Sequence, residues 1–208
     1  MKQNTILIAI IALLIGGIIG YSLIDSDEYD MDGMAGMDHS MMDTDDREYN
    51  DMPMGNMVGM DHSMMMVSSE REFVTGMIPH HQEAVDTANE VLARGGSTPE
   101  IRTLAEGIIE AQEREIAMLK QWHLDWYGEA YVADDSYQPM MRDLSALSGA
   151  DLDRTFLQDM IPHHMGAIMM AQSVRPYIEH QEVSDMADAI MVTQTAEISL
   201  MRDLLNTL

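Results

Sequence analysis

The stretch that decides the fold is REFVTGMIPHHQEAVDTANEVL, residues 71–92, which recurs in altered form as RTFLQDMIPHHMGAIMMAQSVR, residues 154–175. Both copies contain Met-Ile-Pro-His-His, and in both the apolar residues recur every three or four positions, as on one face of an α-helix. A second matching pair follows, EIRTLAEGIIEAQEREIAML at 100–119 and EVSDMADAIMVTQTAEISLM at 182–201. The chain is therefore predicted to contain two copies of a helical hairpin, at about 68–122 and 154–208.

The connection between the hairpins indicates how they are arranged. It spans about 30 residues, 123–153, which is too long for a tight turn between adjacent antiparallel helices. A crossover along the bundle suits this length and is typical of ferritin-like folds. We therefore expect an all-α fold, a four-helix, ferritin-like bundle made of two duplicated helical hairpins over residues 68–208. Part of the connection, around 139–147, is predicted as a short helix.

The repeated pentapeptide supplies candidate metal ligands. Met77 and His81 are four residues apart, as are Met160 and His164, so each pair shares one helix face. The first histidine of each copy is rotated by about 100° from the second. Under a pseudo-two-fold, the two Met/His pairs are expected to face each other near the bundle axis, and two sulfurs with two imidazoles suit Cu(I). The candidate ligands of the bundle are Met77, His80, His81, Met160, His163 and His164.

The second helix of each hairpin carries polar residues on its apolar side. Glu115 and Glu197 lie there, each three residues after a glutamine, Gln112 or Gln194. A buried carboxylate needs a partner, and an imidazole N–H would serve; the carboxylate would then fix the tautomer of a metal-bound histidine. A packing network of histidine, glutamate and glutamine without a metal is the alternative interpretation.

The segment 25–67 has a different composition. It contains two similar 12-residue phrases, MDGMAGMDHSMM at 31–42 and MGNMVGMDHSMM at 54–65. Thioether sulfur is soft and uncharged, so methionine with histidine favours Cu(I) or Ag(I). The segment is acidic and lacks hydrophobic periodicity, which predicts a disordered Met/Asp-rich tail. Its candidate ligands are Met31, Met34, Met37, His39, Met54, Met57, Met60 and His62.

Residues 1–24 are predicted to be an N-terminal transmembrane anchor. The run 5–24 is almost wholly apolar, and about 20 helical residues span a hydrocarbon core of about 30 Å. Lys2 precedes the run and Asp25 follows it, so the positive-inside rule places the soluble domain in the periplasm or outside the cell. The absence of cysteine fits that location. A net charge of −25 argues against a nucleic-acid partner.

The doubled MIPHH, each followed by a helix that reads Gln-x-x-Glu-Ile, resembles the CopM family, also described as domain of unknown function 305. The resemblance implies a ferritin-like bundle exported across the inner membrane and, for characterised members, copper binding and copper tolerance. It implies roles for both histidine pairs, for Glu115 and Glu197, and for a methionine four residues after each glutamate. Met201 is that methionine in the second repeat, whereas in the first repeat Leu119 stands there and Met118 is one residue earlier.

These observations favour a membrane-anchored, extracytoplasmic Cu(I)-binding protein that acts as a buffer or chaperone in copper homeostasis or resistance and is not an enzyme. Copper ions, the membrane and other copper-handling proteins are its expected partners. A ferritin-like metal-dependent oxidoreductase is the first alternative. A di-iron site would want two Glu-x-x-His motifs, but His80-x-x-Glu83 runs in the opposite order and Gly166 stands at the position equivalent to Glu83. A metal-free helical interaction domain is the second alternative.

Overall fold

The computed structural model describes residues 65–133 and 136–208. The predicted transmembrane anchor and the eight candidate ligands of the tail lie outside the described residues. Within the described part, no helix is both long and apolar enough to cross a membrane.

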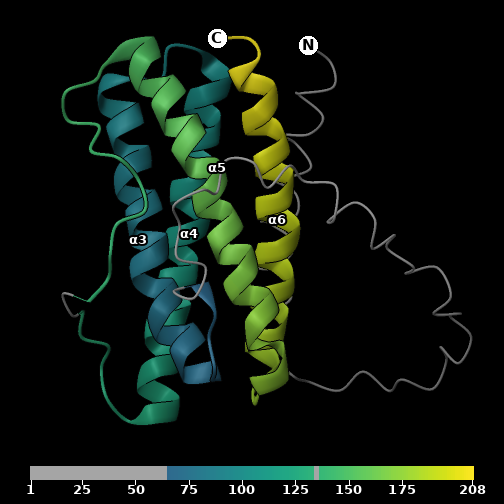
Figure 1. Ribbon diagram of the computed structural model, residues 1–208. Coiled ribbons are helices and arrows are strands. Elements are labelled where there is room, and N and C mark those ends of the chain that lie inside the picture. Colours follow the sequence, from purple (N-terminus) through teal and green to yellow (C-terminus); the bar gives the residue numbers. More distant parts are fainter. Residues whose placement is uncertain (1–64, 134–135) are drawn as a thin grey trace, which may run out of the picture.

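The described chain forms four long α-helices and no strand (Figure 1). Their bounds are Glu70–Arg94 for α3, Pro99–Tyr127 for α4, Gly149–Val174 for α5 and Gln181–Leu205 for α6, with a short 3-10 helix, η4, at Arg175–Tyr177. α3 packs against α4 and α5 packs against α6, and the two hairpins meet mainly where α3 contacts α5. The predicted all-helical bundle of two hairpins is confirmed.

Local sequence signals explain where the helices begin and end. The side chains of Ser69 and Thr98 accept hydrogen bonds from the amides of Glu72 and Ile101, which satisfies free N–H groups at the starts of α3 and α4. α4 ends at Tyr127 and is capped by Gly128, whose φ of 73° lies in the left-handed region that glycine adopts at little cost.

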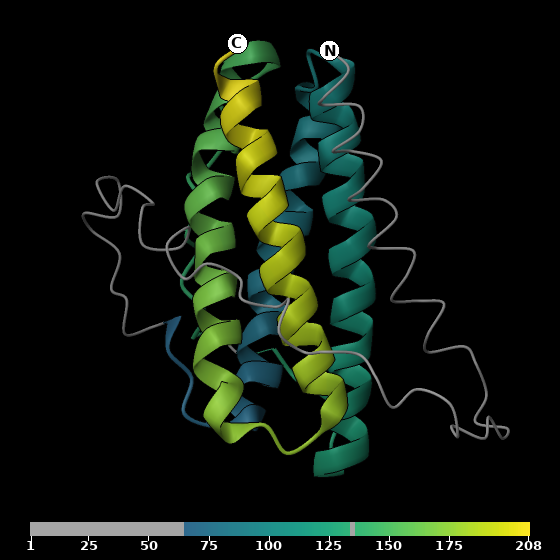
Figure 2. The same ribbon diagram turned by 90° about the vertical axis from the view of Figure 1, so that its right-hand side faces the viewer.

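The connection from α4 to α5 runs back along the length of the bundle (Figures 1 and 2). As a result α4 and α5 run in the same direction, and α3 and α5 are antiparallel neighbours. The prediction of a short helix around 139–147 is wrong, because the chain has no helix there. The amides of Met140 and Met141 instead donate to Glu83 Oε1, both at 2.9 Å, and that of Arg142 donates to Asp159 at 3.0 Å. Carboxylates of α3 and α5 thus take the amide donors that a helix would have used.

The core consists of two apolar clusters with a polar layer between them. One cluster lies at the end where α3 meets α4 and includes Phe156 and Met160; the other lies at the opposite end and includes Phe73 and Met77. The side chains of the layer are buried although they are polar: His80, His81, Gln112, His163, His164, Gln194 and Glu197. Such burial is costly unless the polar atoms have partners, which makes this layer the natural place to look for function.

Candidate metal centre

Two of the four buried histidines meet across the interface between the hairpins. The rings of His80 on α3 and His163 on α5 have centroids 3.9 Å apart with planes tilted by 34°. Within each consecutive pair the ring centroids are about 6 Å apart, at 6.0 Å for His80–His81 and 6.3 Å for His163–His164. The sequence predicts that His81 and His164 meet near the axis, whereas the pair that meets in the structure is one residue earlier on each helix.

The second histidine of each pair faces the partner helix of its own hairpin, because one residue along a helix turns the side chain by about 100°. His164 Nε2 lies 2.7 Å from Glu197 Oε2 in a hydrogen bond. His81 Nε2 lies at the same 2.7 Å from Glu115 Oε2, but its ring nitrogen is not aligned as a hydrogen bond requires. The contacts expected between glutamates and histidines are therefore present in both hairpins, with better geometry in the second. Each Nδ1 of these two histidines has no hydrogen-bond partner among the described residues.

The two glutamines belong to the same layer. Gln112 and Gln194 are each 3% exposed, and the Oε1 atom of each makes no hydrogen bond within the described residues. These carbonyl oxygens are acceptors left over in the layer, so the glutamines do not tie the histidines into a closed network.

His80 is the least satisfied polar group of the layer. It is 1% exposed, and neither of its ring nitrogens has a hydrogen-bond partner in the described chain. Burial lowers the pKa of His80 well below its ordinary value, and repulsion from His163, His81 and His164 lowers it further; the nearby backbone of His163, which is not aligned for a hydrogen bond, offsets only a small part of this. His80 is therefore a neutral imidazole with a free lone pair, which is the state that binds metals.

His163 differs from His80 because it has a carboxylate beside it. Glu83 Oε2 lies 3.3 Å from His163 Nε2, close enough for an ion pair but without hydrogen-bond alignment. Burial lowers the pKa of His163, and the contact with Glu83 offsets part of that effect. Nδ1 of His163 has no partner in the described residues. Both members of the facing pair are thus held neutral near pH 7.

Glu83 also fixes the crossover. Besides its two amide contacts, it accepts a hydrogen bond from the Tyr137 hydroxyl. Burial raises the pKa of Glu83, but the contacts with His163, Tyr137 and Met141 outweigh burial and leave it below its usual value. The same carboxylate raises the pKa of Tyr137, together with burial, which is the larger cause. Glu83 thus stays ionised and joins the crossover to the histidine layer.

Gly166 stands in the second repeat at the position equivalent to Glu83. A methionine sulfur and a histidine nitrogen border the space that a side chain at Gly166 would fill. A Cβ atom at Gly166 would lie 3.1 Å from Met65 Sδ, 3.2 Å from His80 Nε2 and 3.2 Å from Met140 Cε. The missing side chain therefore leaves room in which two methionines approach the unpartnered His80. One repeat places a carboxylate beside the histidine pair, whereas the other opens a space lined by thioethers.

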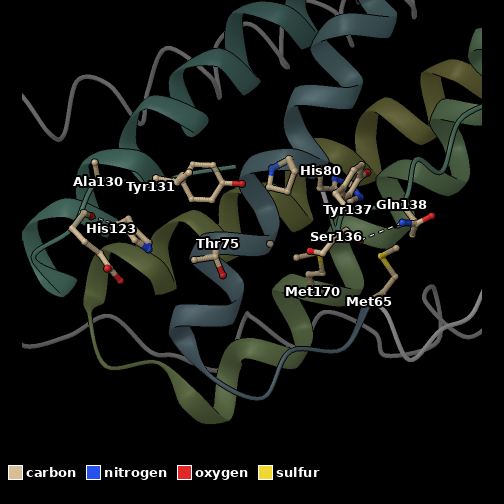
Figure 3. A pocket seen from close by; sticks show the side chains of 14 residues that line it. Met65, Thr75, His80, His123, Ala130, Tyr131, Ser136, Tyr137, Gln138 and Met170 are labelled. Carbon is tan, nitrogen blue, oxygen red and sulfur yellow. Dashed lines mark hydrogen bonds between the residues drawn. The ribbon is translucent and has the colours of Figure 1, made fainter. Parts of the chain in front are cut away.

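A cavity of about 540 Å³ leads to this region, lined among others by Met65, His80, His123, Tyr137 and Met170 (Figure 3). His123 lies at the far end of the cavity from Met65 in this view, and its Nδ1 is 2.8 Å from the carbonyl oxygen of Glu129. The cavity therefore extends to the buried ring of His80, which is 1% exposed.

The methionines singled out in the pentapeptide do not come together. Met77 belongs to one apolar cluster and Met160 to the other, on opposite sides of the histidine layer. The reason is that α3 and α5 are antiparallel, so residues preceding the histidines on the two helices extend in opposite directions. Met118 and Met201 are separated in the same way. The combined site of two sulfurs and two imidazoles is therefore not assembled in this structure.

Sequence reasoning missed Met65, Met140 and Gly166 as parts of this site. The sequence places Met65 at the end of the second phrase, within the tail at 25–67, and Met140 in the crossover. The one available signal was the replacement of Glu83 by Gly166 between otherwise matching repeats, which marks the position where the two copies differ in function. Within the described residues, no group of three or more histidine, aspartate or glutamate side chains is arranged to hold one metal ion. The donors that converge are instead imidazole nitrogen and thioether sulfur.

The fold and the layer define a class: a four-helix bundle in which each of two hairpins buries a consecutive histidine pair in its core. The model of the family described as "Domain of unknown function (DUF305)" matches residues 21–123 and 70–205. The chain belongs to the DUF305 family, as the doubled MIPHH led us to expect.

Solved structures agree with this assignment. A structure of CopM in the Cu(I)-bound form is 37% identical, covers 68% of this chain and 98% of its own, and superposes with a TM-score of 0.60. CopM in an Ag-bound form obtained by soaking is 33% identical, with the same coverage and TM-score. A DUF305 fragment from Deinococcus radiodurans is 29% identical over 69% of this chain and 99% of its own, with a TM-score of 0.58. No curated protein matches the chain significantly.

Proposed function

We propose that this protein binds Cu(I), and Ag(I) in its place, in the buried histidine layer of a ferritin-like bundle. The observation that carries the proposal is His80, whose two ring nitrogens are buried and unpartnered. Leaving a buried polar group unsatisfied costs about 1–3 kcal/mol, and a bound cation would remove that cost. The copper ion is the cargo of the protein in this account.

The chemistry of the donors supports a soft monovalent ion. The layer offers imidazoles held neutral by burial, so no proton has to be displaced from His80 before it binds a metal. The thioether groups of Met65 and Met140 border the approach to His80 at Gly166, outside the set of imidazoles that holds the ion. Imidazole together with thioether selects copper in its lower oxidation state over harder ions such as Mg²⁺ or Ca²⁺. The likeness to CopM, whose structures contain Cu(I) or Ag, supports the same choice.

Glu115 and Glu197 have a supporting role in this account. Each carboxylate contacts Nε2 of the second histidine of a pair, which leaves Nδ1 of that histidine as the atom able to bind a metal. Carboxylate partners of this kind orient a ligating histidine and increase its basicity. A metal-free packing network would use the same contacts, but it would leave His80 and the two glutamine oxygens unsatisfied.

We further propose that the protein handles copper outside the cytosol, as a buffer or chaperone attached to the membrane through residues 1–24. The apolar run at 5–24 and the charges on either side of it support the attachment. A binding role is favoured over an oxidoreductase because the glutamates of the layer contact histidines rather than forming the carboxylate-rich centre that a di-iron enzyme needs.

The test is an anaerobic Cu(I) titration of the full-length chain in detergent against a coloured Cu(I) chelator, with parallel titrations of Fe(II) and Zn(II). His80→Asn with His163→Asn should abolish the tightest Cu(I) site. His180→Asn is the matched control, because it removes an imidazole that pairs with Glu70 outside the layer. Circular dichroism must show helical folding for all variants.

Full retention of tight Cu(I) binding in the folded double variant would contradict the proposal. A preference for Fe(II), combined with oxidase activity of the loaded protein, would favour the oxidoreductase instead.

A further inference from the structure

Met65 ends the second tail phrase in the sequence, and in the structure its side chain lies next to the histidine layer. It is the last residue of MGNMVGMDHSMM, 54–65, and its side chain lines the cavity that reaches His80 (Figure 3). The next residue, Met66, is 59% exposed. The amide of Val67 then donates to Ser173 Oγ at 3.0 Å, which ties the chain to α5 just after Met65.

The sulfur of Met65 and a nitrogen of His80 flank one point in space. Met65 Sδ is 3.1 Å and His80 Nε2 is 3.2 Å from the position that a Cβ of Gly166 would take. His80 is 1% exposed, and its Nε2 has no hydrogen-bond partner among the described residues. A soft donor from the tail side and a free, buried nitrogen of the bundle therefore approach the same open space.

The first repeat closes the equivalent space. Glu83 fills it and binds the amides of Met140 and Met141 and the hydroxyl of Tyr137. The pseudo-symmetry of the hairpins is thus broken at this position, where the Gly166 side places the sulfur of Met65 near His80.

We propose that Met65 is a transfer ligand, which passes a soft monovalent cation, Cu(I) or Ag(I), from the Met/His phrase to His80 over Gly166. The inference rests on the proposed function, because it requires the histidine layer to be the destination. The step is a ligand exchange in which one sulfur–metal bond is replaced by one nitrogen–metal bond. The ion keeps its charge and no electron or proton is transferred, since His80 is already neutral.

Gly166 has a defined part in this route. An added methyl group would lie within 3.2 Å of Met65 Sδ and His80 Nε2, where these atoms have to move toward a shared ion. Met140, whose methyl group is 3.2 Å from the same point, closes the space from the crossover side. The absence of a side chain at 166 is therefore a condition for exchange between the sulfur and the nitrogen.

The experiment measures how fast the full-length protein in detergent takes Cu(I) from a coloured chelator complex, by stopped-flow absorbance under anaerobic conditions. Met65→Leu should lower the uptake rate into the tight site by about tenfold or more, because one soft donor on the path is lost. The affinity and stoichiometry of the tight site should change little. Met66→Leu is the matched control, since it removes an adjacent but exposed sulfur and should keep the wild-type rate.

A second pair of variants tests the space itself. Gly166→Ala should slow uptake as Met65→Leu does. Gly107→Ala should not, because a Cβ at this helical glycine of α4 meets nothing within 4 Å. Both alanines favour the helix equally, so a general change in helix stability would affect the two variants alike.

Each outcome decides the matter. A wild-type rate for Met65→Leu or Gly166→Ala, or equal slowing by Met66→Leu, overturns the transfer role while leaving the tight site established. Loss of the tight site in Met65→Leu would make Met65 a resident ligand and would also overturn it. Absence of any tight site in the wild-type protein would overturn the proposed function itself.

Discussion

The two hairpins are alike where they orient histidines and different where they approach the facing pair. His81–Glu115 in the first hairpin and His164–Glu197 in the second have the same 2.7 Å separation. Two residues after these histidines, Glu83 binds the crossover in the first repeat, whereas Gly166 in the second leaves a space bordered by Met65 and Met140. The comparison indicates that both repeats kept the glutamate that contacts a buried histidine. At the position of Glu83 and Gly166 they diverged, so that one side of the facing pair is covered by a carboxylate and the other borders an open space.

The largest expected effect comes from removing the charge on the closed side. Glu83→Gln keeps the shape of the side chain but weakens its contacts with two amides, a hydroxyl and His163. Hydrogen bonds to charged groups contribute about 1.5–3 kcal/mol each, so we expect the free energy of unfolding to fall by about 3 kcal/mol. Urea denaturation should show this loss. The exposed Glu106→Gln is the control, and an equal, small change in both would mean that Glu83 does not hold the crossover.

A smaller effect is expected from the glutamates that orient the histidines. Glu197→Gln should weaken Cu(I) binding by about 10–100-fold, the range for partners of metal-bound histidines. Glu115→Gln should weaken it less, because its contact with His81 is poorly aligned and the carboxylate is more exposed, 18% against 5%. Chelator competition measures both affinities. The reverse order would contradict the difference that we see between the hairpins.

The smallest effect concerns pH. The pKa of His80 and of His163 is lowered in the folded protein by burial, so below about pH 6.5 the unfolded chain binds more protons than the folded one. Stability of the metal-free protein should therefore fall as the pH drops below about 6.5, by at most about 1.4 kcal/mol per pH unit for each histidine. Thermal unfolding across that range should have a shallower pH slope in the His80→Asn, His163→Asn variant. Identical slopes would show that these imidazoles are not held neutral by the fold.

The elements of this fold were predictable because their signals are local. The apolar residues that recur every three or four positions in both repeats indicate the helices, and the length of the connection at 123–153 indicates a crossover. Which histidines meet was not predictable, since it depends on how far α3 is rotated against α5, and one residue changes the answer. The separation of Met77 from Met160 follows from antiparallel packing, which no local pattern encodes. Met65 was not predicted as a site residue because the composition of the surrounding segment assigns it to the tail. In the structure its sulfur nevertheless lies beside Gly166 of the bundle.

The most direct test of the central claim is a titration of the full-length protein, labelled with ¹⁵N at histidine, with Ag(I), followed through the imidazole nitrogen resonances. Single His→Asn variants assign the signals of the eight histidines. The first equivalent of Ag(I) to bind tightly should shift resonances of the layer, His80 among them, and should leave His180 unchanged. Shifts confined to His39 and His62, with the four histidines of the layer unaffected at saturation, would contradict the account.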